Sequence, residues 1–296
     1  MNNDRIQEIL DLMEEARLDY FLISDPQSIA YCTGYYNDPH ERMFVFMISK
    51  HGNHTLFMND LFYLEHDLDV NIVWHKDGQD AIQTIVDEMH FPGRIGIDKN
   101  WASHFLLDLM KKLPDAKYIN ASPCVDLVRM KKDLQEQVLM IESSKINDAV
   151  MEEIIPFIQE GVTEKQLAKK LDELFFNHHS TCYGAIVAFG KNAADPHHEN
   201  DDTPLRKGDC VLIDMGCVYK GYCSDMTRTF FYEGILEEEI KVYEIVKKAN
   251  EAAEAMIKPG VKLSDIDKCA RKVISDEGYG KYFTHRLGSF YWSRCS

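Results

Sequence analysis

The chain has 296 residues, of which 45% are hydrophobic, and its formal net charge is −16. This length predicts one large domain or two of ordinary size, and the acidic surface argues against nucleic acid and anionic membranes as partners. The sequence has no run of about eighteen apolar residues, and its N-terminus, MNNDRIQEIL, lacks the apolar region of a signal peptide. We therefore expect a cytoplasmic protein without a membrane span. Eight cysteines occur without a C-x-x-C pair, which argues against a zinc ribbon or a thioredoxin-type motif.

The first part of the sequence alternates between helical and strand patterns. Residues 4–17 place their apolar side chains near one helical stripe, and DYFLIS follows as a strand. Asp25 is a candidate helix cap, with Pro26 at the first helical position. Further strand patterns occur at RMFVFMIS, HTLFM, VNIVW and RIGID, with helical patterns such as DAIQTIVDEMH and FLLDLMKKL between them. This alternation predicts an α/β domain over residues 1–128.

The composition changes to charged residues at VRMKKDLQEQVLM, where we place the domain boundary, so that the second domain covers residues 129–296. It opens with two helical patterns, the second of which begins with a T-x-x-Q capping box at Thr163. Strand patterns follow at YGAIVAFG, CVLIDMG and CVYKGYCSDMTRTFFY, and KYFTHRLG predicts one more strand near the end. The predicted helices of this domain are residues 133–158, 163–176, 236–257 and 263–277.

Two aspartates lie in the β-rich part of the second domain. Asp214 ends an apolar strand, and Asp225 lies eleven residues later in the strand that follows. A carboxylate in a buried strand is costly unless it is paired or bound to a metal, and a turn containing Gly216 would bring both carboxylates to one cavity. Oxygen ligands on adjacent strands suit Mn²⁺, Zn²⁺ or Co²⁺. The alternative is a solvated turn residue and a strand aspartate that pairs with Arg228, because two carboxylates make only half of a metal site.

A loop with paired histidines precedes these aspartates. In AFGKNAADPHHEN, Gly190 breaks a strand and the following loop presents His197 and His198. Paired histidines on a loop are most often surface residues. However, His197 lies seventeen residues before Asp214, so three polar groups of one site type occur close together in the sequence, all at strand edges.

Four motifs occur in a definite order: FG-x-N-A-A-x-P-H, V-L-I-D-M-G, Y-x-S-D-M-T-R-T and F-T-H-R-L-G. In this order and spacing they resemble the Xaa-Pro peptidases, the metallopeptidase family of prolidases and aminopeptidases P. FLISDPQSIAYCTGYY resembles the N-terminal domain of the same family, and LVRMKKDLQEQ resembles its domain junction, so the resemblance covers most of the chain. It implies an α/β N-terminal domain and an α+β pita-bread (creatinase/aminopeptidase-like) C-terminal domain that is incomplete at its C-terminus.

The resemblance also implies roles for four residues. Asp214 is expected to bind one metal ion and Asp225 to bridge two, so the cofactors are two divalent ions, Mn²⁺ before Co²⁺ or Zn²⁺. His197 is expected to contact the substrate and to stabilise the developing charge, and His285 to line the same pocket as a second catalytic residue. In the family, the two ions hold a bridging hydroxide that attacks the peptide bond before a proline, and the substrate is a short proline-containing peptide. The resemblance also implies a homodimer, as an expectation for the full-length family member.

The sequence departs from this family at position 289. The family pattern places a ligand histidine there and two ligand glutamates further on, but this chain has Ser289 and ends at Ser296. Three of the five protein ligands expected from the family are therefore missing. We expect this chain to bind its metal ions poorly and not to be an efficient peptidase.

A shift of reading frame would account for this departure. If the codons after Gly288 are read one base later, Trp292 followed by Ser293 always gives glycine, and Tyr291 gives isoleucine or threonine. These residues agree with the family pattern G-I-G-L-D-V, and a shifted His-Glu pair gives serine and a stop codon. We infer a one-base insertion near the codon of Gly288. The alternative is an unrelated natural C-terminus.

Two other functions are compatible with the same fold. A non-catalytic pita-bread binding protein is possible because ligands are missing. A metal-free amidinohydrolase resembling creatinase is disfavoured, because that relative lacks the metal-binding aspartates and both are present here. A decaying enzyme should lose site residues piecemeal, whereas here the pattern is intact up to Gly288 and lost after it, which indicates a single event.

Overall fold

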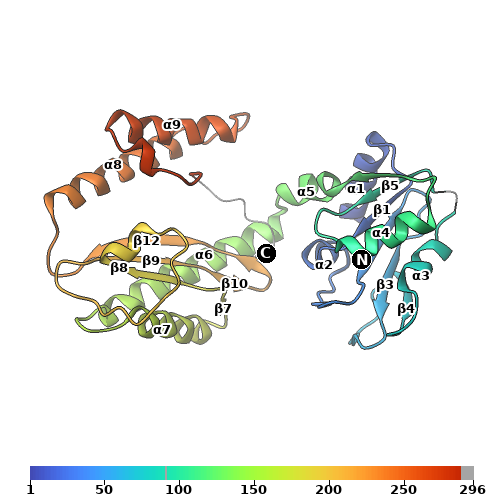
Figure 1. Ribbon diagram of the computed structural model, residues 1–296, viewed down its shortest axis with the longest axis horizontal. Helices are drawn as coiled ribbons and strands as arrows, with labels where there is room; N and C mark the ends of the chain where they lie inside the picture. The colour runs from blue at the N-terminus through green and yellow to red at the C-terminus, as the bar shows by residue number, and fades with distance from the viewer. Residues whose placement is uncertain (91, 288–296) are drawn as a thin grey trace. The chain divides into compact units, whose positions relative to one another are not determined.

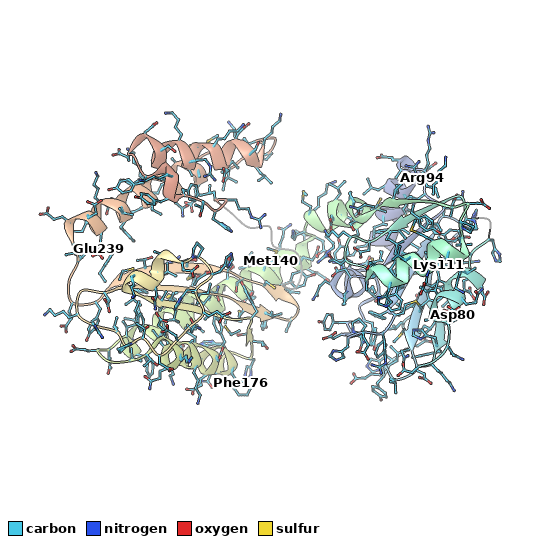
Figure 2. The ribbon with its side chains drawn as sticks, viewed as in Figure 1. Asp80, Arg94, Lys111, Met140, Phe176 and Glu239 are labelled. Carbon is cyan, nitrogen blue, oxygen red and sulfur yellow. The ribbon has the colours of Figure 1, made fainter. Side chains whose placement is uncertain are left out.

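The computed structural model describes residues 1–90 and 92–287, which form two compact units (Figure 1). The N-terminal unit comprises Met1–Asp133, and the C-terminal unit begins at Leu134. Ser289 and the rest of the segment for which we expect a frame shift lie outside the described residues. Among the helices that the structure describes, none is both long enough and apolar enough to cross a bilayer.

The N-terminal unit is built on one mixed sheet of six strands. In this sheet β1 pairs antiparallel with β2 and parallel with β5. The α/β architecture predicted for this part of the sequence is confirmed. In spatial order the strands are β4 (Asn71–His75), β3 (Thr55–Asn59), β2 (Val45–Ser49), β1 (Tyr20–Ile23), β5 (Arg94–Ile97) and β6 (Lys117–Asn120).

Both faces of this sheet are covered by helices (Figure 1). Successive side chains of a strand point to opposite faces, so Phe21 and Ile23 pack into one hydrophobic core while Tyr20 and Leu22 pack into the other. All four side chains are at most 2% exposed. The first core is closed by α1 (Asn3–Glu15), α2 (Pro26–Thr33) and α5 (Ser122–Met130), and the second by α3 (Ala81–Asp87) and α4 (Ser103–Lys112).

Local capping signals in the sequence are confirmed in both units. The Asp25 carboxylate accepts the backbone N–H of Ser28 at 2.9 Å, with Pro26 at the first helical position of α2. In the C-terminal unit, Thr163 and Gln166 form the reciprocal capping box predicted for the start of α7 (Glu164–Asn177). Each cap satisfies backbone N–H groups that the first turn of a helix leaves without partners.

The C-terminal unit contains a three-stranded antiparallel sheet with α6 (Leu134–Ile154) and α7 packed against one face (Figure 1). Val211, Ile213 and Met215 alternate along the central strand and point into the core with these helices. The strand order is β12 (Met226–Phe231), β9 (Cys210–Met215) and β8 (Ile186–Phe189).

A second small sheet interrupts the path from β9 to β12. It consists of β11 (Tyr222–Cys223), β10 (Cys217–Tyr219) and β7 (Thr181–Cys182) in spatial order. The second strand does fold back on the first, since β12 pairs antiparallel with β9, but the turn expected at Gly216 is wrong. The chain passes through Gly216 into β10 and reverses at Lys220 and Gly221, whose φ angles of 48° and 86° match a type I′ hairpin turn. It then returns to pair with β9 as β12.

The helices α8 (Glu237–Glu254) and α9 (Leu263–Asp276) form a separate small core with five buried side chains. The strand predicted for KYFTHRLG is wrong for its described residues: Gly280–Tyr282 is a 3₁₀ turn, and irregular chain follows to Leu287. Among the described residues no strand pairs with this segment, and a side chain of α9 binds its backbone carbonyl groups. The Arg271 guanidinium donates hydrogen bonds to the carbonyl oxygens of Phe283, at 2.7 Å, and His285, at 3.0 Å.

Candidate functional site

Asp214 lies on the face of β9 opposite the helical layer. Its neighbours Ile213 and Met215 point into the core, so the alternation of the strand directs Asp214 to the other side. In the register of the sheet Thr227 of β12 lies opposite Asp214, and the Thr227 hydroxyl donates a hydrogen bond to Asp214 Oδ1 at 2.7 Å. The aspartate is thus fixed by a partner that the β9–β12 pairing supplies.

Asp225 lies directly before β12, one residue outside the strand in which we expected it. Because Met226 pairs with Met215, the next residue back along the chain reaches the region of Asp214. Burial, and then the negative charge of Asp214, raise the pKa of the Asp225 carboxyl from 3.8 to about 6. The structure therefore brings the two carboxyl groups into direct electrostatic contact, although they come from different strand ends.

Gly216 is required at this point by close packing. The Tyr183 hydroxyl donates a hydrogen bond to the carbonyl oxygen of Ser224 at 2.6 Å. A Cβ atom on Gly216 would lie 2.1 Å from this hydroxyl and 2.2 Å from this carbonyl oxygen. Burial, and then the charges of Asp225 and Asp214, raise the pKa of Tyr183 well above its usual range. Tyr183 thus supports the backbone of the residue before Asp225.

Side chains of α6 hold the same segment from the other side. Asn147 Nδ2 donates to the carbonyl oxygen of Met215 at 3.4 Å, and Ser143 Oγ donates to the carbonyl oxygen of Cys217 at 3.3 Å. Asn147 and Ser143 are almost fully buried. Since a buried backbone carbonyl needs a hydrogen-bond donor, these two residues stabilise the irregular passage from β9 to β10 that sets the position of Asp225.

The pair of aspartates fits a divalent cation. Two neighbouring carboxyl groups repel when both are ionised, and the raised pKa of Asp225 is the result of burial and, after it, of this repulsion. A divalent ion between them would remove the repulsion, and carboxylate oxygens are ligands for Mn²⁺, Co²⁺ and Zn²⁺. The remaining coordination positions would have to come from other donors.

The structure also brings the two predicted catalytic histidines together. The rings of His197 and His285 have centroids 6.5 Å apart and are inclined at 74°. The His197 backbone N–H donates to Asp195 Oδ1 at 3.0 Å within its loop, and the His285 carbonyl is held by Arg271. Both histidines are exposed, so their rings are accessible to a ligand.

Glu164 binds the loop that carries His197, and the sequence analysis did not identify this residue. Its side chain is fully buried at the first position of α7, and its two oxygens accept four hydrogen bonds. Oε1 accepts from the backbone N–H of Phe189 and from Asn192 Nδ2, at 2.8 and 2.9 Å. Oε2 accepts from His198 Nε2 and from the backbone N–H of Asp201, at 2.6 and 3.1 Å. These donors lie on both sides of His197 in the sequence, so Glu164 anchors the loop that carries it.

Glu164, His198 and Asp201 also offer possible metal-ligand atoms within 4.8 Å of one another. The hydrogen bonds nevertheless favour a structural role for this cluster, because every acceptor position on Glu164 that faces the loop already has a donor. A glutamate in the first turn of a helix is common for electrostatic reasons. The sequence therefore contained no signal that set Glu164 apart.

Comparison with known families identifies the chain. The model of the family described as "Metallopeptidase family M24" matches residues 138–291. The model described as "Creatinase/Prolidase N-terminal domain" matches residues 5–131. The chain belongs to metallopeptidase family M24. The family resemblance and the creatinase-type and pita-bread fold predicted from the sequence are thereby confirmed. The M24 chain is by family a metallopeptidase, and enzymes of this family use divalent metal ions.

The relatives and solved structures that match this chain are longer than the chain itself. An uncharacterized peptidase from Staphylococcus aureus is 31% identical over 293 residues, which cover 96% of this chain and 82% of the relative. The crystal structure of a dipeptidase from Pyrococcus horikoshii is 34% identical with a TM-score of 0.88, covering 98% of this chain and 83% of that one. A prolidase from Thermococcus sibiricus is 29% identical with a TM-score of 0.92, covering 99% and 83%.

Proposed function

We propose that this M24 chain is an Xaa-Pro dipeptidase or aminopeptidase-type metallohydrolase, which cleaves the peptide bond before proline in short peptides. The observation that carries the proposal is the pair of carboxyl groups of Asp214 and Asp225, brought together on the face of the sheet opposite its helices. The similarity to a dipeptidase and to a prolidase supports the substrate class.

The cofactors in this proposal are two divalent metal ions, with Mn²⁺ favoured over Co²⁺ and Zn²⁺. Asp214 would bind one ion, and Asp225 would contact both. Thr227 would keep Asp214 oriented through its 2.7 Å hydrogen bond. When bound, such ions supply a Lewis acid and lower the pKa of a water molecule.

His197 and His285 act on the substrate in this proposal. Their rings lie 6.5 Å apart, and each is carried by a segment anchored elsewhere, one through Glu164 and the other through Arg271. An imidazole at this position can donate a hydrogen bond to a carbonyl oxygen that gains negative charge. We assign these two residues to substrate binding and charge stabilisation and not to metal coordination.

Ser289 stands where the family pattern has a ligand histidine, so we propose that this chain holds its ions weakly and has little activity. Two carboxylates can attract a divalent ion, but they do not fix two ions about 3.5–4 Å apart, as two-metal hydrolases require. We further propose a cytoplasmic location and, for the full-length form, a homodimer.

The test compares four proteins for Mn²⁺ stoichiometry and for hydrolysis of an Xaa-Pro dipeptide. They are the present chain, a chain with the inferred extra base deleted, and Asp225→Asn and His197→Ala in the restored chain. We expect activity only in the restored chain and, at reduced turnover, in His197→Ala. Asp225→Asn should lose metal and activity together, because an amide bridges two cations poorly.

The metal content of the histidine variant separates the two kinds of residue. His197→Ala should retain nearly all of its Mn²⁺ while its turnover falls by roughly a factor of 10²–10⁴, the range for a positioned catalytic group. Full activity in the unrestored chain would contradict the expected ligand set. A restored chain that binds two ions but cleaves no proline peptide would favour the non-catalytic binding protein.

A further inference from the structure

Two free cysteines lie directly opposite each other in the small sheet of the C-terminal unit. Cys182 of β7 pairs with Cys217 of β10 in the antiparallel register. Side chains of residues that face each other in an antiparallel pair lie on the same face of the sheet. Cys217 is fully buried and Cys182 packs against the same hydrophobic core. The two thiols therefore share one environment although they are far apart in the sequence.

The hydrogen-bond pattern defines which kind of pair this is. The next pair in the same register is Tyr183 with Gly216, and the backbone N–H of Tyr183 donates to the Gly216 carbonyl at 3.4 Å. Hydrogen-bonded and non-hydrogen-bonded pairs alternate along an antiparallel ladder. Cys182 and Cys217 consequently form a non-hydrogen-bonded pair, in which the side chains approach most closely.

This spacing matches the geometry of a disulfide. The Cα atoms of a non-hydrogen-bonded pair lie about 4.5 Å apart, at the short end of the range of about 4.4–6.8 Å that disulfides span. We propose that Cys182 and Cys217 form a covalent modification site, a dithiol that low-molecular-weight disulfides such as oxidised glutathione convert to an intramolecular cross-strand disulfide. The proposal is independent of the peptidase reaction.

The chemistry proceeds by two exchange steps. The Cys182 sulfur, as its thiolate, attacks one sulfur of oxidised glutathione and releases one glutathione thiolate, which leaves a mixed disulfide on Cys182. The Cys217 thiol loses its proton and attacks the Cys182 sulfur, which releases the second glutathione. Two protein thiols are oxidised to one disulfide, and one molecule of oxidised glutathione is reduced to two thiols.

Burial determines the order and the rate of these steps. Cys182 is half-buried whereas Cys217 is fully buried, so the oxidant reaches Cys182 first. Burial, with a smaller contribution from the Asp172 carboxylate, raises the pKa of Cys182 to about 11. Because the thiolate is the attacking species, oxidation should be slow at neutral pH and should accelerate as the pH rises.

The bridge would form next to the support of the aspartate pair. Cys182 precedes Tyr183, whose hydroxyl binds the Ser224 carbonyl, and Cys217 follows Gly216, which packs against that hydroxyl. A disulfide between them would tie both sides of this contact together. It would therefore restrain the backbone on which the position of Asp225 depends.

The test uses the whole chain, treated with oxidised glutathione at pH 8 and then digested with trypsin without reduction. Cys182 falls in the tryptic peptide 171–191 and Cys217 in the peptide 208–220, which also contains Cys210. We expect mass spectrometry to detect these two peptides joined, and dithiothreitol to separate them. The joined form should be more resistant to thermal unfolding, because a cross-link restricts the unfolded chain.

Two variants identify the sulfur atoms. Cys210 is the matched control: burial raises its pKa to about 11 as well, but the residue opposite it in β12 is Phe231. Cys210→Ser should give the same joined peptides and the same thermal shift, whereas Cys182→Ser should give neither. A joined peptide that disappears in Cys210→Ser would overturn the proposal, as would a Cys182 that stops at a stable mixed disulfide with glutathione.

Discussion

The two units of the chain bury their sheets in different ways. In the N-terminal unit, both faces of a six-stranded sheet lie under helices, and the side chains of β1 are buried in both directions. In the C-terminal unit, the side chains of β9 alternate between the core under α6 and α7 and a half-buried face that contains Asp214. The helices α8 and α9 pack mainly on each other and form a separate small core.

The difference in burial determines which sheet mainly stabilises the fold and which sheet can carry charged groups for a reaction. A sheet covered on both faces by apolar side chains has no room for unpaired charges, because a buried carboxylate needs compensation. The half-buried face of β9 can carry a carboxyl group whose charge is left for a ligand. We therefore expect substitutions in the N-terminal unit to act on folding, and substitutions on this face of the C-terminal unit to act on metal binding.

The largest expected contrast is in limited proteolysis of the intact chain. The N-terminal unit should persist as a fragment that ends near residues 129–133, while the C-terminal unit is degraded from the α8–α9 region. Large apolar side chains are exposed there, among them Leu236, Val246 and Ile257, and a small core opens locally at low cost. Mass spectrometry of the fragments over time checks this, and equal resistance of both units would show that they are equally well packed.

A core substitution should divide the units next most clearly. Phe46→Ala removes a fully buried side chain from the first core of the N-terminal sheet, which should cost about 3–5 kcal/mol. Region-resolved hydrogen exchange in denaturant should show the loss in β1 and β2 and leave β9 unchanged. Tyr63→Ala is the control, since Tyr63 is 77% exposed and the change should stay within about 0.5 kcal/mol.

Glu164→Gln should produce a smaller effect confined to the C-terminal unit. The amide cannot accept all four hydrogen bonds of the carboxylate, and a buried donor without its acceptor costs about 1–3 kcal/mol. Hydrogen exchange should accelerate in β8 and in the His197 loop. The exposed Glu160→Gln serves as the control, and an equal response to both changes would refute the anchoring role of Glu164.

Asp225 and Asp19, one in each unit, should contribute pH dependences of stability with opposite signs. The pKa of Asp225 is raised in the folded state to about 6. At a pH between the pKa of the unfolded state and about 6, folding is therefore coupled to the uptake of a proton by this carboxyl group. The metal-free C-terminal unit should consequently gain stability as the pH falls through 6. Asp225→Asn should remove this gain, which denaturant titrations of chelator-treated protein at several pH values would reveal.

Asp19 in the N-terminal unit should show the smallest and opposite effect. Burial raises its pKa, but hydrogen bonds from Lys50 and from the backbone N–H groups of Arg94 and Gly93 outweigh burial, and the net shift is downward. Its contribution to stability is present above the unfolded pKa and is lost as the pH falls through the folded pKa. The loss should appear in β1 and β5 on acidification and should be absent in Asp19→Asn.

Features that depend on neighbouring residues in the sequence were predictable. The Asp25 cap and the box of Thr163 and Gln166 are satisfied within one helical turn. The pairing of Asp214 with Thr227, near Asp225, joins two strands that lie close in the sequence, although β10 and β11 come between them. The roles of these aspartates and of His197 and His285 remain predictions.

Features that depend on distant partners were not predictable. Glu164 looks like an ordinary first-turn glutamate until the chain returns to it from Phe189 and His198. The segment that ends at Leu287 has the sequence pattern of a strand. In the structure, however, Arg271 donates hydrogen bonds to two of its backbone carbonyl oxygens. In both cases the segment is held by a side chain that lies outside it in the sequence.

The close approach at Gly216 has a consequence for anyone who makes a library of variants. The 2.1 Å separation from the Tyr183 hydroxyl means that even alanine at position 216 would displace Tyr183 and the backbone of Ser224, the residue before Asp225. In a saturation library, every substitution of Gly216 should therefore disturb the fold at this point. Lys220 in the nearby hairpin has a φ of 48°, so its replacement by glycine should be tolerated. Two positions four residues apart would thus have opposite tolerance, one limited by space and the other by backbone torsion.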